Sequence, residues 1–224
     1  MTVRTVLLYG CAAAVVMPGT QILAAVIGPG RAAGGPLVPL GAWRRPFPVG
    51  AAALVALMTA FAVAQSAFPA MVGRLERVPD GAWWRVLTAL LVQSSGWFQI
   101  VFNLAALIAV APVAEWLFGT VRMLGVYVTG GVAAQVVSAA GWSPHGAGNS
   151  VAVCALVGAL AAGYALRGSV PGVRRLALLV PAAGTVLCLL ADNHGVGLLV
   201  GAALGTGLTL LQRTDEPVGR PATP

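Results

Sequence analysis

Residues 148–167 read GNSVAVCALVGALAAGYALR and carry no charged side chain before Arg167. As an α-helix, the part from Ser150 onward would rise roughly 25 Å at about 1.5 Å per residue, which approaches the ~30 Å hydrocarbon core of a bilayer. This stretch therefore predicts a membrane-spanning helix that begins at a serine. Small residues recur at every fourth position and would form one narrow face for helix packing. They are Ser150, Cys154, Gly158 and Ala162.

A second stretch of this kind lies near the C-terminal end, where residues 194–205 read HGVGLLVGAALG. Here Gly197, Gly201 and Gly205 recur on nearly the same face as His194. One helix, at roughly 176–191, returns the chain between the two stretches, so Ser150 and His194 should lie at similar depth. If the two small-residue faces pack together, the hydroxyl and the imidazole can approach to the roughly 2.6–3.2 Å that a general base requires.

The rest of the chain has the same apolar character, with 58% hydrophobic and 8% charged residues, which excludes an ordinary soluble domain. Long uncharged runs alternate with short charged segments, and the run between Arg122 and Arg167 is long enough for two helices. We predict an all-α, polytopic membrane protein, a six-helix bundle with a possible extra N-terminal transmembrane helix. The expected helices are roughly 48–70, 94–113, 120–140, 150–166, 176–191 and 194–212, with the extra one near 5–28.

The chain divides into four parts in this interpretation. Residues 1–30 form an N-terminal apolar segment, residues 31–45 a linker rich in Gly, Pro and Ala, residues 46–213 the six-helix domain, and residues 214–224 a polar cytoplasmic tail. Arg4 followed by an apolar run is also typical of a signal peptide. We favour an uncleaved anchor with an external N-terminus, because export of the following residues would place the linker arginines outside.

The basic residues indicate the orientation and the partners. All 13 are arginines, set against 6 acidic residues. Arginine marks loops retained in the cytoplasm, so we expect the six-helix unit to begin and end on the cytoplasmic side of the cell membrane. The lipid bilayer is then the main partner. Nucleic-acid binding is not expected, because the arginines are scattered over loops rather than gathered on one face.

The cysteines do not indicate a cofactor. Cys11, Cys154 and Cys188 all lie in apolar runs and are too dispersed for a disulfide framework or a zinc site. We interpret them as small packing residues and predict neither a metal nor a cofactor.

Ser150 and His194 are the candidate catalytic pair. Each alone has a simpler explanation, a helix N-cap for the serine and an interfacial residue for the histidine, but their matched depth favours a nucleophile and its base. Gln99 and Asn103 lie one turn apart in an apolar run and could donate to an oxyanion, or could form interhelical hydrogen bonds instead. We expect His145 to be solvated, and we interpret Asp192 as a solvated loop charge rather than an orienting group.

Five ordered motifs, spanning about Arg45 to Arg213, resemble those of the rhomboid family of intramembrane serine proteases. They are Trp84-Arg85, Gly96-Trp97-Phe98-Gln99 through Asn103, Glu115 with Gly119 and Arg122, Gly148-Asn149-Ser150, and His194-Gly195-Val196-Gly197 with Gly201. The resemblance implies a six-helix rhomboid-like fold and a Ser/His dyad that cleaves transmembrane protein substrates near the outer membrane face. Ser150 would attack the scissile carbonyl and His194 would take and return the proton. Asn103 and the Ser150 backbone amide would stabilise the oxyanion, with Gln99 as a further donor.

Three positions depart from the family pattern. Gln99 stands where the family usually has histidine, Val151 replaces the glycine after the serine and adds bulk beside the nucleophile, and Cys154 replaces an aromatic residue one turn below. These changes leave open a catalytically weak or inactive rhomboid-like protein that binds transmembrane helices. A small transporter or scaffold is less favoured, because the sequence has no inverted repeat. The sequence leaves the substrate's identity and the oligomeric state open.

Overall fold

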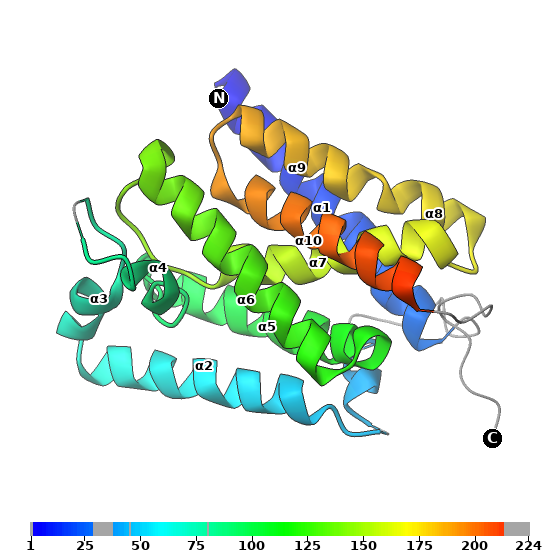
Figure 1. Cartoon of the computed structure of the whole chain (residues 1–224), viewed down its shortest axis with the longest axis horizontal. Helices are drawn as coiled ribbons and strands as arrows, with labels where there is room; N and C mark the ends of the chain where they lie inside the picture. The colour runs from blue at the N-terminus through cyan, green and yellow to red at the C-terminus, as the bar shows by residue number, and fades with distance from the viewer. Residues whose placement is uncertain (1, 29–37, 45, 80, 213–224) are drawn as a thin grey trace.

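The computed structural model describes residues 2–28, 38–44, 46–79 and 81–212, and nearly all of their regular structure is helical. Seven helical segments in these ranges are long and apolar enough to cross a membrane, so the chain is a multi-pass integral membrane protein (Figure 1). The predicted all-α bundle with an extra N-terminal helix is confirmed. The seven segments are α1 (Val3–Ile27), α2 (Val49–Ala67), α5 (Gly96–Phe118), α6 (Thr120–Val137) with its π-helical end η2 (Ser138–Trp142), α7 (Ser150–Arg167), α8 (Pro171–Ala177) with α9 (Leu179–Leu189), and α10 (Asn193–Leu211).

Three short elements connect these spans. The 3-10 helix η1 (Val38–Trp43) falls within the predicted linker, of which residues 38–44 are described. The Trp43 Nε1–H donates to the Ile108 carbonyl at 2.9 Å and thereby fastens η1 to α5. Helices α3 (Ala70–Leu75) and α4 (Arg85–Thr88) lie between α2 and α5. The predicted tail at residues 214–224 lies outside the described part of the chain.

One predicted span differs from the structure at its start. Instead of beginning near residue 176, it begins at Pro171, and it consists of two helices that meet at Leu178. Pro181 explains the break, because its ring has no N–H and would clash with the carbonyl four residues earlier, at Ala177. Proline is also well suited to the first turn of α8, where no N–H is needed.

Helix α7 is the central element of the bundle. In its most apolar stretch of 18 residues, 67% of the residues are buried. The corresponding fraction is 50% or less in each of the other six described spanning segments. Leu156 of α7 belongs to the same buried apolar core as Leu107 of α5, Met123 of α6 and Leu198 of α10. The serine at the start of α7 is therefore carried by the most enclosed helix of the structure.

Direct backbone contact joins α7 to α10. A Cβ at Gly197, Gly201 or Gly205 would overlap the carbonyl oxygen of Val151, Ala155 or Ala159 respectively. The glycine face of α10 is therefore packed as predicted, and only residues without a side chain allow this approach. On α7, the predicted face takes part in this contact through Cys154, which lies against Gly197, and through Gly158, where a Cβ would overlap the Leu198 carbonyl oxygen. The carbonyls of residues 151, 155 and 159, which were not predicted to take part, also belong to the contact surface.

Helix α1 packs against α9, α8 and α7. Its Arg4 Nη2 donates to the Leu190 carbonyl at 3.4 Å, just before α10 begins. The N-terminus of α1 therefore lies at the end of the bundle where α7 and α10 begin, which we call the Ser150 end. The chain then reaches the opposite end at Ile27.

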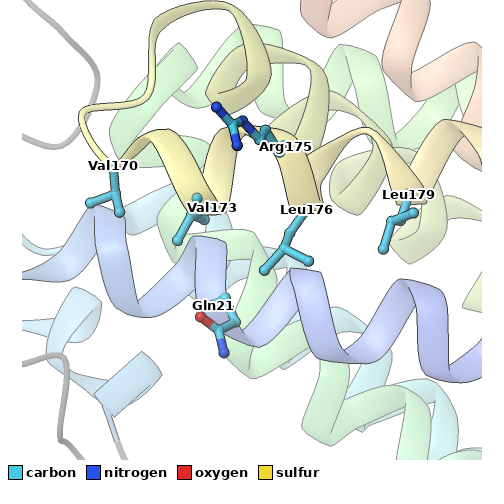
Figure 2. Close-up of a pocket in the computed structure, with 7 residues that line it drawn as sticks. Gln21, Val170, Val173, Arg175, Leu176 and Leu179 are labelled. Atoms are coloured by element: carbon cyan, nitrogen blue, oxygen red, sulfur yellow. The ribbon is translucent and has the colours of Figure 1, made fainter.

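A shallow groove of about 530 Å³ lies where α8 meets α1. Figure 2 shows Val173 and Leu176 on one side of it and Gln21 of α1 on the other. These residues lie near the start of α8 and the end of α1, so the groove belongs to the opposite end of the bundle from Ser150. It is therefore separate from the site described below.

Glu115 closes the opposite end of the bundle. Its carboxylate accepts the backbone N–H of Gly50 at 3.0 Å and that of Ala51 at 2.6 Å, as well as the hydroxyl of Thr120. A negative charge at the start of α2 satisfies N–H groups that have no partner within the helix and complements the helix dipole. Gly119, with φ +83°, turns the chain directly into α6. Glu115 and Gly119 thus tie the start of α2 to the α5–α6 turn.

Replacing Glu115 with glutamine should lower the melting temperature of the detergent-solubilised protein. The substitution removes the charge and directs an amide N–H₂ at donor groups, and hydrogen bonds to charged groups contribute about 1.5–3 kcal/mol each. Thermal unfolding followed by circular dichroism measures the effect. Glu76→Gln, which removes a carboxylate after α3, is the matched control and should melt like the wild type; equal melting of both variants would contradict the capping role.

Candidate active site

The structure brings Ser150 and His194 together. Ser150 is the first residue of α7 and His194 the second of α10, and the Ser150 Oγ lies 2.9 Å from the His194 Nε2. The close α7–α10 packing described above holds the two helix starts at this separation. The His194 side chain is 41% exposed and Ser150 is half-buried, so both can be reached from the Ser150 end. This geometry suits transfer of a proton from the hydroxyl to the imidazole.

The loop before α7 is fixed by glycine at position 148. Gly148 has φ +153°, and a Cβ there would overlap the Nε2 of Gln99. Its N–H donates to the Ala89 carbonyl at 2.9 Å, and its carbonyl accepts from the buried Gln135 Nε2 at 3.3 Å. Only a residue without a side chain fits this position, and two residues later the chain places Ser150 at the helix start.

Arg77 holds the same loop from the outside. Its side chain is 3% exposed, and its guanidinium donates to the carbonyls of Ser143 and His145. Backbone hydrogen bonds of 3.1 and 3.0 Å also join Arg77 and Gly146. Burial lowers the pKa of Arg77 from its ordinary value. No role for Arg77 was predicted from the sequence. The rarity of charged residues in this chain was the signal that could have drawn attention to it.

Gln99 and Asn103 lie beside this loop, but they form hydrogen bonds within the protein. The Gln99 Oε1 accepts the Ser95 backbone N–H at 2.7 Å, and its Nε2 donates to the Ala147 carbonyl at 3.1 Å. The Asn103 Nδ2 donates to the Gln93 Oε1 at 2.7 Å. Both amides therefore support the chain that leads into Ser150.

Gln93 is the centre of a buried amide network that was not predicted from the sequence. Its Nε2 donates to the Asn149 Oδ1 at 2.9 Å, and its backbone exchanges hydrogen bonds with the side chain of Gln65. Gln93, Gln65 and Asn149 are all buried. Polar side chains in apolar surroundings require partners, so their presence in apolar runs was the signal that could have revealed the network.

The interpretation of Asp192 as a solvated loop charge is wrong. Its side chain is 26% exposed, and its Oδ1 lies 2.7 Å from the His194 Nδ1 and accepts the His194 backbone N–H at 3.0 Å. Burial alone would raise the pKa of Asp192, but the hydrogen bonds and charge of His194 outweigh it and hold the pKa below its ordinary value. His145, in contrast, is exposed as predicted.

The two other residues that depart from the family pattern differ in burial. Val151 is 2% exposed and belongs to the apolar core, so its bulk is enclosed within the bundle. Cys154 is half-buried one turn below Ser150, at the interface with Gly197.

In the described ranges, His, Cys, Asp and Glu side chains form no group of three or more that could hold a metal ion.

A protein-family model, that of the rhomboid domain, matches the chain. This model covers residues 80–211, more than half of the chain, and includes α4 through α10 with Ser150, Asp192 and His194. Comparison with curated proteins gives no match.

Proposed function

The chain belongs to the rhomboid family, whose members are generally intramembrane serine proteases, and from this we propose that it is an intramembrane serine endopeptidase. Its substrates would be transmembrane proteins of the cell membrane, cut near the outer face. The observation that carries the proposal is the 2.9 Å contact between the Ser150 Oγ and the His194 Nε2 at the start of two membrane-spanning helices. A serine so paired has a base within reach for nucleophilic attack.

Exposed aromatic residues support a location near the membrane boundary. Trp97 and Phe98, at the start of α5, are 66% and 83% exposed, and Trp83 before α4 is also exposed. Tryptophan is enriched where the bilayer meets water, so these residues fit the interfacial level beside Ser150. The scissile bond would therefore lie in the outer boundary region rather than at the bilayer centre.

The distribution of arginines supports the outer face for the Ser150 end. More arginines lie toward the opposite end, as expected for cytoplasmic loops. The described arginines there are Arg44, Arg122, Arg167, Arg174 and Arg175, and those at the Ser150 end outside α1 are Arg74, Arg77 and Arg85.

The proposed reaction uses Ser150 and His194 in two stages. The Ser150 Oγ bonds to the scissile carbonyl carbon while its proton passes to the His194 Nε2. The C–N bond then breaks as the Nε2 returns this proton to the leaving amine, which yields an acyl-enzyme. Water, deprotonated by the His194 Nε2, attacks the ester carbonyl, and the Ser150 Oγ recovers a proton as the carboxylic acid product leaves.

Donors for the developing oxyanion would come from α7 and α5. Ser150 is the first residue of α7, so its backbone N–H precedes the first hydrogen-bonded turn of the helix and belongs to the same residue as the Oγ. The amide nitrogens of Asn103 and Gln99 each carry two hydrogens, and the bonds to Gln93 and Ala147 use one of each. The remaining N–H groups are the candidate side-chain donors.

A second candidate is a catalytically weak or inactive rhomboid-like protein that binds transmembrane helices. It is favoured by the hydrogen bonds of Gln99, which hold both ends of its amide against Ser95 and Ala147 and leave a single N–H that cannot turn freely toward an oxyanion. Loss of one oxyanion donor costs about 10²–10³-fold in kcat in other serine proteases. A protein without this donor would cleave slowly but would still bind transmembrane helices.

Ser150→Ala should abolish cleavage of a transmembrane reporter. The full-length protein is purified, reconstituted into liposomes with a fluorogenic reporter whose helix is weakened near its outer boundary, and the cut site is mapped by mass spectrometry. We expect turnover to fall about 10³-fold or more, because the nucleophile is gone. Ser66→Ala removes a hydroxyl from α2 at the same end of the bundle, where it bonds only locally to Ala62, and should cleave normally.

Two results would contradict the proposal. Equal turnover by the wild type and Ser150→Ala would exclude Ser150 as the nucleophile. Saturable binding of the uncut reporter by the wild type, without detectable product, would support the second candidate instead.

A further inference from the structure

We infer that Asp192 is a positioning residue for His194, so that the site operates as a Ser150–His194–Asp192 triad rather than as a dyad. The inference rests on the proposed function. It goes beyond that function because the predicted mechanism used two side chains and assigned no role to the carboxylate.

The geometry is that of a continuous hydrogen-bonded chain through the imidazole. The Ser150 Oγ lies 2.9 Å from the Nε2, and the Asp192 Oδ1 lies 2.7 Å from the Nδ1 on the other side of the ring. The same Oδ1 accepts the backbone N–H of His194 at 3.0 Å, which also fixes the carboxylate relative to α10. Both ring nitrogens thus have a defined partner, and the plane of the ring is set by the two contacts.

The carboxylate determines which ring nitrogen carries the proton. An ionised carboxylate can only accept, so the hydrogen between His194 and Asp192 must lie on the Nδ1. In the neutral imidazole the Nε2 then has a lone pair, and that lone pair faces the Ser150 hydroxyl. This is the tautomer that can take the serine proton. When the proton arrives, Asp192 lies beside the resulting imidazolium and stabilises it.

Asp192 is ionised where the enzyme would work. Its pKa lies below the ordinary value, because the hydrogen bonds and charge of His194 outweigh burial, and the charge of Arg4 on α1 acts in the same direction. Among the described residues, three thiols on the packed helices also interact with the Asp192 charge. They are Cys11 on α1, Cys154 on α7 and Cys188 on α9.

Capping alone does not account for the contact with the Nδ1. Asp192 is the N-cap of α10, a role that asparagine and serine fill about as well. These two residues therefore separate capping from positioning. Asparagine keeps the cap and an oxygen near the Nδ1 but removes the charge, whereas serine keeps the cap and is too short to reach the ring.

The test measures how fast a fluorophosphonate probe labels Ser150 as a function of pH, in the full-length protein in detergent. Relative to the wild type, Asp192→Asn should lower the plateau rate by about tenfold or more, and Asp192→Ser should lower it further. Melting temperatures should change little, since both substitutions preserve the cap. Glu76→Gln, which removes a carboxylate elsewhere at the same end of the bundle, should retain the wild-type rate.

Wild-type labelling rates in both Asp192 variants would overturn the triad while leaving the proposed function intact. No labelling of the wild type, or labelling that persists in Ser150→Ala, would instead overturn the proposed function and the triad together. A further measurement tests the hydrogen bond between Asp192 and His194 without depending on activity. The proton NMR spectrum should contain a downfield Nδ1–H resonance in the wild type and in His145→Ala, and should lack it in Asp192→Ser; its absence from the wild type would contradict the hydrogen bond itself.

Discussion

Replacing His194 with alanine should lower turnover of the transmembrane reporter about a thousandfold or more. Without the imidazole, the Ser150 hydroxyl has no base at 2.9 Å to take its proton, and the leaving amine has no acid to protonate it. The effect should appear in kcat, because the reporter does not need the imidazole in order to bind. Initial rates at saturating reporter in liposomes measure it directly.

The chain offers a matched control for this substitution. His145 is the second of its two histidines and has an exposed side chain in the loop before α7. His145→Ala should therefore keep near-normal turnover. A His194→Ala protein that is folded and retains more than about a tenth of wild-type turnover would contradict the role of His194 as the base.

Replacing Gly201 with leucine should have the largest effect on stability. A single Cβ at this position would already overlap the Ala155 carbonyl oxygen, and a leucine adds three more carbons at a backbone contact that cannot give way as a side chain would. Overpacking in cores typically costs about 1–3 kcal/mol, and we expect at least the upper part of that range here. The variant should melt at a markedly lower temperature, and Ser150 labelling should also fall, because separation of α7 from α10 separates Ser150 from His194.

Gly207→Leu is the control for helix propensity and added bulk. Gly207 lies on the same helix, and a Cβ at this position would meet no packing partner within 4 Å. Leucine there should therefore face lipid and leave the melting temperature unchanged or higher. Similar melting of the two glycine variants would show that the α7–α10 contact is not the critical packing surface.

The membrane-spanning helices could be predicted because length and apolarity are local properties of a sequence. Two features of these helices were not predicted, because they depend on backbone atoms rather than on hydropathy. Pro181 divides one span by acting on the carbonyl of Ala177, a steric effect that hydropathy does not register. The predicted small-residue face of α7 meets α10 at Cys154 and Gly158, but the carbonyls of Val151 and Ala155 also form the contact. These carbonyls were not predicted, because the size of a side chain does not indicate which backbone atoms it leaves accessible.

The pairing of Ser150 with His194 followed from matched depth and from motifs, but the surroundings of the pair did not. The position of Asp192 depends on a tight turn in which Ala191 takes φ +54°, an uncommon conformation for a residue other than glycine. That turn directs the carboxylate to the ring rather than to water. Arg77 and Gln93 act on residues more than fifty positions away, and a single sequence gives no direct information about such contacts.

The most direct test of the central claim is the location of a covalent adduct. The wild-type protein is treated with a fluorophosphonate in liposomes, digested, and analysed by mass spectrometry beside Ser150→Ala and His194→Ala. We predict one adduct on the peptide that contains Ser150, absent from Ser150→Ala and strongly reduced in His194→Ala. An unmodified wild-type protein, or an adduct on any other residue, would contradict it.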